Sequence, residues 1–103
     1  MNNKIKQEQI TPFYEFDRCI FRIVKEESEN NYVLYEYDKI WNSEYVKEAG
    51  ASEIIIDYLQ SSINAYTENM QNDFIKYNDK ILNVYNNLIV IYNNLINDLK
   101  NHI

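Results

Sequence analysis

The sequence has few of the residues that most small functional sites require. Its 103 residues include one Gly, one Pro, one Cys and one His. One Gly cannot form a glycine-rich phosphate loop, and one His cannot supply an ordinary zinc site or a Ser-His-Asp triad. A lone Cys cannot form an intramolecular disulfide, which excludes the disulfide-stabilised class of small secreted domains. We therefore expect a protein that is not an enzyme and holds no cofactor or metal ion.

Basic residues and long apolar runs are also scarce. Ten Lys and Arg stand against sixteen Asp and Glu, which gives a net charge of −6. Direct nucleic-acid binding is not expected, because such proteins gain affinity by neutralising phosphates with Lys and Arg. The longest apolar run, residues 88–92, is far shorter than the roughly 20 residues of a membrane span. Residues 1–10 lack the apolar stretch of a signal peptide. We expect a cytoplasmic protein with no membrane contact.

Asn, Ile and Tyr are abundant, with 16, 15 and 10 copies against 3 Ala. Apolar and aromatic residues make up 46% of the chain, which is too many for a disordered protein. The length predicts a single domain. Within it we expect a flexible N-terminus over residues 1–10, a layer containing a β-hairpin over residues 11–50, and a helical region over residues 51–103.

Two short runs, residues 19–24 and 32–37, are rich in β-branched and aromatic residues, as strands are. The polar segment between them predicts the turn of a β-hairpin, because its Asn pair tolerates positive φ. We expect one face of this hairpin to carry the odd-numbered residues Cys19, Phe21, Ile23, Val33, Tyr35 and Tyr37. An alternative for residues 12–24 is a helix, because Thr11 and Pro12 suit its start. A short helix over residues 12–17 that runs into a strand reconciles the two signals.

Residues 43–49 are expected to form a short helical turn that ends at Gly50, the one residue free to adopt a left-handed cap. Ser52 is then placed to cap a new helix. No Gly or Pro follows up to residue 103, so nothing in the composition interrupts that helix.

A heptad repeat is the clearest pattern in the second half. Residues 85–89 and 92–96 have the same sequence, Tyr-Asn-Asn-Leu-Ile. Apolar residues alternate at steps of four and three, the spacing of a helical seam. The seam predicted for self-association consists of Phe74, Tyr77, Ile81, Val84, Leu88, Ile91 and Leu95. We favour one continuous coiled-coil-like helix, and a helical hairpin with a break at residues 69–73 is the alternative.

The apolar side of this helix is wider than a two-stranded seam requires, because further columns flank the first two. Neighbouring elements or other chains must therefore pack against this helix from two directions. A continuous helix would also extend beyond what the first fifty residues can cover. We expect a homo-oligomer, with a dimer as the first choice. The Asn residues of the heptads form the polar face. They are read as neutral, solvent-facing positions, and a ladder of Asn that binds a partner is the alternative.

No catalytic constellation is evident. His102 lies at a helix end that is expected to fray, and Cys19 is read as a small apolar residue. Glu36 and Asp38 share one face of a strand and could in principle serve glycoside hydrolysis or bind a divalent ion. Their spacing also arises by chance in so acidic a chain.

Tyr is a preferred interface residue. The candidate partner-binding surface is therefore acidic and aromatic, with Glu26, Glu27, Glu29, Tyr32, Glu36, Asp38 and Tyr45.

These observations predict an α+β fold, with a small N-terminal β-hairpin layer followed by a long C-terminal helical region. They favour a non-enzymatic protein-binding module. The specific hypothesis is a small acidic inhibitor of the kind carried by phages and other mobile elements, which covers the surface of a host nuclease or defence complex. The alternative is a coiled-coil scaffold or adaptor that assembles with itself.

Overall fold

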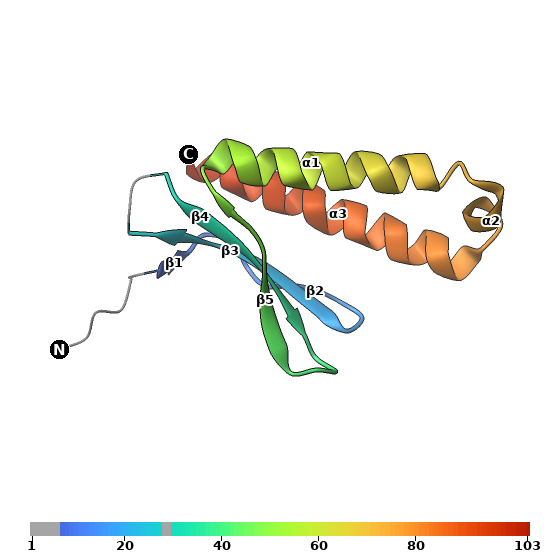
Figure 1. The fold of residues 1–103 in the computed structure, drawn as a ribbon, viewed down its shortest axis with the longest axis horizontal. Helices are drawn as coiled ribbons and strands as arrows, with labels where there is room; N and C mark the ends of the chain where they lie inside the picture. The colour runs from blue at the N-terminus through green and yellow to red at the C-terminus, as the bar shows by residue number, and fades with distance from the viewer. Residues whose placement is uncertain (1–6, 28–29) are drawn as a thin grey trace.

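The computed structural model describes residues 7–27 and 30–103 of the chain. An antiparallel sheet comes first and a pair of long helices follows (Figure 1). The strands are β1 (Gln7–Gln9), β2 (Tyr14–Phe16), β3 (Cys19–Glu26), β4 (Tyr32–Asp38) and β5 (Ser43–Gly50). The helices are α1 (Ser52–Asn69), the single-turn α2 (Asp73–Lys76) and α3 (Asp79–His102). The α+β fold class predicted from the sequence is confirmed.

The predicted β-hairpin is the centre of the sheet. Strands β3 and β4 pair from Cys19 opposite Asp38 to Lys25 opposite Tyr32. Asn30, in the turn between them, has a φ of 47°, a positive φ of the kind that Asn tolerates. Strand β5 extends the sheet beside β4, and β1 and β2 both pair with β3. The alternative of a helix over residues 12–17 is wrong, because residues 14–16 form strand β2.

Pro12 separates β1 from β2 along the same edge of β3. Proline has no N–H for a strand ladder, and the chain bridges the interruption with the side chain of Thr11. The Oγ1 atom of this buried residue accepts a hydrogen bond from the backbone N–H of Ile23 at 3.0 Å. A side-chain oxygen thus takes the place of a strand carbonyl at the point where the ladder is broken.

The prediction of which residues of β3 and β4 share a face of the sheet is wrong. The register sets Phe21 opposite Glu36 and Ile23 opposite Leu34. Because residues that are directly paired point to the same side of a sheet, the odd-numbered residues of β3 share a face with the even-numbered residues of β4. Tyr35 and Tyr37 therefore lie on the opposite face from Phe21 and Ile23, away from the helices.

The junction between sheet and helices also differs from the expectation. Residues 43–49 belong to strand β5 and do not form a helical turn. Gly50 ends this strand with a φ of +142°, a conformation that other residues rarely adopt. The prediction that Ser52 caps this helix is wrong, because Ser52 is the first residue of α1 and the N-cap is Ala51, which has no side-chain oxygen. The backbone N–H of Ser52 donates to Oδ1 of Asn30 at 3.2 Å. A residue of the β3–β4 turn thus supplies the hydrogen-bond acceptor for a backbone N–H at the start of α1.

The helical region is a hairpin, and the favoured single continuous helix is wrong. The chain reverses between α1 and α3, which pack side by side (Figure 1). Two asparagines define this reversal. The side chain of Asn72 accepts from the N–H of Phe74, and that of Asn78 accepts from the N–H of Ile81. Asn amides compete for backbone groups in this way, and at these two positions they cap new helical segments.

The core lies between one face of the sheet and the helical hairpin. It contains 12 buried apolar residues: Phe21, Ile23, Tyr32, Leu34, Ile55, Leu59, Ile63, Ile91, Tyr92, Leu95, Ile96 and Leu99. Val24 and Val33 are also buried, but they pair with each other on the opposite face of the sheet. The hairpin is longer than the part of it that the sheet covers, so its α2 end projects beyond the strands (Figure 1). The molecule is accordingly elongated, 56 × 29 × 17 Å. Within residues 7–27 and 30–103, no helix has the length and apolar character needed to cross a membrane.

Candidate binding surface

The residues of the predicted acidic surface do not come together as one patch. Glu26 and Glu27 lie at the end of β3 that leads into the β3–β4 turn, whereas Asp38 ends β4. Six residue steps of strand, about 20 Å, separate the two ends of β4. Glu29 lies outside the described residues. Tyr32 is only 4% exposed and belongs to the core, so its assignment to a partner-binding surface is wrong.

Asp38 has a structural role in the β4–β5 turn. One carboxylate oxygen accepts from Arg18 at 2.7 Å, and the other accepts from the backbone N–H groups of Ile40 and Trp41. The Arg18 hydrogen bond, together with these two backbone donors, lowers the pKa of this carboxyl. Asp38 is 7% exposed. Its carboxylate is therefore already bound, and its assignment to a partner-binding surface is also wrong.

Glu36 lies on the helix-facing side of the sheet, beside Cys19. The thiol Sγ lies 3.7 Å from the Glu36 carboxylate, which also pairs with Lys47 Nζ at 3.6 Å. Burial raises the pKa of Cys19 to about 11, and the charge of Glu36 adds to this shift. The thiol is therefore protonated at neutral pH and is a poor nucleophile. This cluster is suited to packing and not to covalent chemistry.

The carboxylate pair considered for catalysis is not free to act. Glu36 and Asp38 do share one face of β4, as predicted, but Asp38 is held by Arg18 and the turn backbone. His102 is exposed at the end of α3, with its ring 6.2 Å from that of Tyr32. Over the part of the chain that the structure describes, no three His, Cys, Asp or Glu side chains are grouped so that they could hold a metal ion.

The predicted self-association seam is divided by the fold. Ile91 and Leu95 are buried in the core of the chain itself. Ile81 and Leu88 are half-buried. The remaining three seam residues are exposed: Phe74 at 91%, Tyr77 at 77% and Val84 at 37%.

The face of the sheet that points away from the helices carries a cluster that the sequence analysis did not assign. We call it the outer sheet face, and its residues come from β3, β4, β5 and the segment before β2. Its apolar members include Phe13 and Val46, which are 63% and 58% exposed. The full set is Phe13, Ile20, Arg22, Tyr35, Tyr37, Glu44 and Val46.

Arg22 is held at the centre of the outer sheet face by three neighbours. Its guanidinium donates to the carboxylate of Glu44, with the shortest contact at 3.0 Å. It also lies over the ring of Tyr35, 4.7 Å from the ring centroid, and 5.9 Å from that of Phe13. Planar guanidinium groups stack on aromatic rings in this way. The centre of the face is thus rigid, and its two opposite charges compensate each other.

A pocket of about 340 Å³ opens in this face. It is lined by Phe13, Ile20, Arg22, Tyr37 and Glu44. Two aromatic rings and an aliphatic side chain form its walls, and the Arg22–Glu44 pair supplies its polar part. The pocket has the size of a site for one or two side chains, and its chemistry suits an apolar group that ends in a hydrogen-bonding atom.

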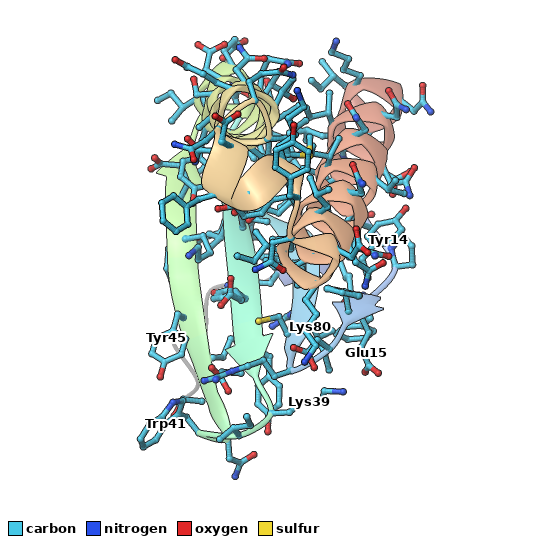
Figure 2. The ribbon with its side chains drawn as sticks, turned by 90° about the vertical axis from the view of Figure 1, so that its right-hand side faces the viewer. Tyr14, Glu15, Lys39, Trp41, Tyr45 and Lys80 are labelled. Carbon is cyan, nitrogen blue, oxygen red and sulfur yellow. The ribbon has the colours of Figure 1, made fainter. Side chains whose placement is uncertain are left out.

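The end of the sheet near the β4–β5 turn is also apolar and open. Ile40 and Trp41 in the turn are 67% and 69% exposed. Figure 2 shows Trp41 and Tyr45 projecting on the β5 side of the sheet, and Glu15 and Lys39 at its other side. Lys39 Nζ pairs with Glu15 at 3.2 Å. Tyr45 is the one predicted partner-binding aromatic that is exposed, at 47%.

The sequence contains a signal for the outer sheet face. Val33, Tyr35 and Tyr37 alternate along β4, which correctly predicts that they share one side of a strand. Because a shift of register by one residue exchanges the faces of a strand, the partners of Tyr35 and Tyr37 could not be inferred from alternation alone.

In comparisons with protein-family models, with curated proteins and with solved structures, nothing matches this chain.

Proposed function

We propose that the protein is a non-enzymatic protein-binding module and that the outer sheet face contacts its partner. The observation that carries this proposal is the aromatic pocket built around Arg22. The helices bury the other face of the sheet, and the aromatic side chains of this one stay open to a partner. Tyr, Phe and Arg are the residue types that contribute most to protein interfaces.

The geometry favours a partner that inserts an apolar side chain into the pocket. The Arg22–Glu44 pair offers hydrogen-bonding atoms at one wall and little net charge. Phe13 and Val46 flank the centre and would exclude water from it, as residues around a binding hot spot do. Arg22 is already ordered by Tyr35 and Phe13, so binding would cost little further side-chain entropy.

The β5 edge of the sheet is less suited to a partner strand, and the opposite edge is interrupted at Pro12 between β1 and β2. Strand β5 carries Glu44, Lys47 and Glu48, and its pairing with β4 is irregular between Leu34 and Tyr35. Charged side chains and bulges are the features by which edge strands avoid pairing with other chains. The partner is therefore expected to contact the side chains of the outer sheet face and not to extend the sheet.

The net charge of −6 favours a partner whose surface is basic around the inserted side chain. A nuclease, or another protein that binds nucleic acid, has such a surface. A small acidic protein that covers it would inhibit the enzyme by excluding the nucleic acid. This is the specific form of the proposal, and it needs no catalytic residue in the protein itself.

The test compares two variants of the protein in capture experiments from cells of its native organism. The variant Phe13→Ser with Tyr37→Ser removes two walls of the pocket. The control Val90→Ser removes an apolar side chain of similar exposure, 58%, from α3. We expect the wild type and the control to capture the same protein, and the pocket variant to lose it at least tenfold. Thermal unfolding checks that both variants are folded.

Two results would contradict the proposal. Equal capture by the pocket variant and the wild type would exclude the outer sheet face as the binding surface. Binding that does not weaken when salt is raised would exclude a basic partner attracted by the net charge, because screening weakens attraction between exposed charges.

A further inference from the structure

The projecting end of the helical hairpin exposes apolar side chains that the fold itself does not use. Phe74 and Tyr77 are 91% and 77% exposed, and Val84 in α3 is 37% exposed. We call these three residues the distal patch. The sheet lies under the other end of the hairpin (Figure 1). An aromatic ring with this exposure contributes little to folding stability, since it buries little area.

The distal patch continues a helix face that the chain buries elsewhere. Val84 precedes Ile91 by seven residues, or two helical turns, so the two lie on the same side of α3. Ile91 and Leu95 are 7% and 0% exposed. Lys80 lies one turn before Val84, at the end of α3 that projects beyond the strands and faces the viewer in Figure 2. One side of α3 is therefore covered in its second half and uncovered in its first half.

The distal end is also ordered before any partner binds. Asn72 and Asn78 cap the two helical segments of the reversal. Behind it, the ring of Tyr66 in α1 lies 5.0 Å from that of Tyr85 in α3. Lys76 Nζ lies 5.6 Å from the centroid of the Tyr77 ring. An exposed surface that is held in this way loses little conformational freedom on association.

Charge indicates what covers the distal patch. Residues 69–97 contain two acids and two bases, Asp73, Asp79, Lys76 and Lys80, and so carry no net charge. All of the net charge of −6 lies in the rest of the chain. The rest of the chain holds eight bases and fourteen acids, so two copies repel each other on average over that part, which disfavours association. In this segment they meet without net repulsion, and the two signs can pair between copies.

We propose that the distal patch is a self-association surface through which two copies of the chain form a two-fold symmetric dimer. A neutral segment offers no net attraction to a basic partner or to an anionic membrane, whereas a second copy brings the same apolar residues and both signs of charge. A two-fold interface requires such a self-complementary surface. The proposal goes beyond the binding function above, because it uses a different surface and leaves both outer sheet faces free.

The first test measures the mass of the full chain by light scattering over a range of concentrations up to the submillimolar. We expect the mass to rise from 12.5 kDa towards twice that value. The variant Phe74→Ser with Tyr77→Ser should remain a monomer throughout, and the control Val90→Ser should dimerise as the wild type does. A wild type that stays monomeric, or a control that loses dimerisation as fully as the double variant, would overturn the proposal.

The second test uses charge reversal and needs no binding partner. One variant carries Asp73→Lys with Asp79→Lys, and the other carries Lys76→Glu with Lys80→Glu. Each should be monomeric alone, because its distal segment becomes strongly charged with one sign. An equal mixture should form a heterodimer of dimeric mass. Homodimerisation of either variant, or a monomeric mixture, would overturn the proposal, and neither result bears on the outer sheet face.

Discussion

The two ends of the helical hairpin have the same kind of sequence and opposite surroundings. At the sheet end, Leu59 and Leu95 are fully buried. At the projecting end, Phe74 and Tyr77 are almost fully exposed. Both sets belong to one pattern of apolar residues at steps of three and four. Helical periodicity therefore shows which residues share a side of a helix, and not whether anything covers that side.

The two ends also differ in how they are held together. The sheet end is tied to the strands by the hydrogen bond from Tyr14 to Asp98, 2.5 Å long, and by the edge-to-face contact of Phe21 with Tyr92. The projecting end is held by two local Asn caps and a pair of tyrosine rings. Contacts between the strands and the helices stabilise the first end, whereas the second is held only by contacts within the helical hairpin. Substitutions should therefore lower the free energy of unfolding more at the sheet end than at the projecting end.

The largest expected effect comes from Leu95→Ala, which creates a cavity in the core. Its side chain is fully buried between the helices and the sheet, so we expect a loss of about 2–5 kcal/mol in the free energy of unfolding. The matched variant Tyr77→Ala should cost less than about 0.5 kcal/mol under conditions in which the protein is monomeric. Urea denaturation measures both. Equal losses would show that the projecting end belongs to the cooperative core.

A smaller effect is expected from Tyr14→Phe, which removes the hydrogen bond between the sheet edge and α3. The loss should be about 1 kcal/mol near neutral pH. Burial, with the hydrogen bond and charge of Asp98, raises the pKa of Tyr14 from 10.0 to about 12. The folded state therefore favours the neutral phenol, and this contribution to stability is complete below pH 10 and is lost as the pH rises towards 12.

The pH dependence of stability distinguishes the contribution of Tyr14 from those of the other tyrosines. Burial also raises the pKa of Tyr92, so some alkaline destabilisation should remain in the variant. The stability difference between the wild type and Tyr14→Phe should shrink between pH 10 and pH 12, when both are followed by denaturation at each pH. A difference that grows over this range would contradict the assigned direction of the Tyr14 shift.

A loss no larger than that of Tyr14→Phe is expected from Asn78→Ala at the projecting end. This substitution removes the side-chain acceptor of the Ile81 N–H and should cost about 0.5–1 kcal/mol as a lost helix cap. Hydrogen exchange should show faster exchange in the first turn of α3, with unchanged protection around Leu95. Loss of protection in the core as well would mean that the two ends of the hairpin unfold together.

The sequence patterns predicted the central strands and the helical region well, because these depend on local periodicity and composition. The β-branched and aromatic composition of residues 19–24 and 32–37 located β3 and β4, and the Asn pair between them indicated a turn, in which Asn30 has a positive φ. The strand over residues 43–50 was missed because its charged residues resemble an exposed helical turn. It forms a strand because β4 offers it backbone partners at both of its ends, with one irregularity between Leu34 and Tyr35.

The candidate binding surface could be predicted only in part. Tyr45 was correctly placed at the surface, whereas Tyr32 and Asp38 are buried by their neighbours in space. The pocket around Arg22 combines four segments of the chain, and its position depends on the pairing of β3 with β4. No local pattern contains that register.

The sequence by itself determined the α+β class, the hairpin at the centre of the sheet and the extent of the helical region, because hydrophobic periodicity and turn residues act over a few neighbouring positions. Only the tertiary structure decided where the helix reverses, which face of each strand is buried and which part of the heptad seam is left open. These depend on contacts between residues far apart in the chain, where burial against one neighbour overrides the local preference. The outer sheet face is open because the helical hairpin covers only the other face of the sheet, and the distal patch is open because the hairpin extends beyond the strands.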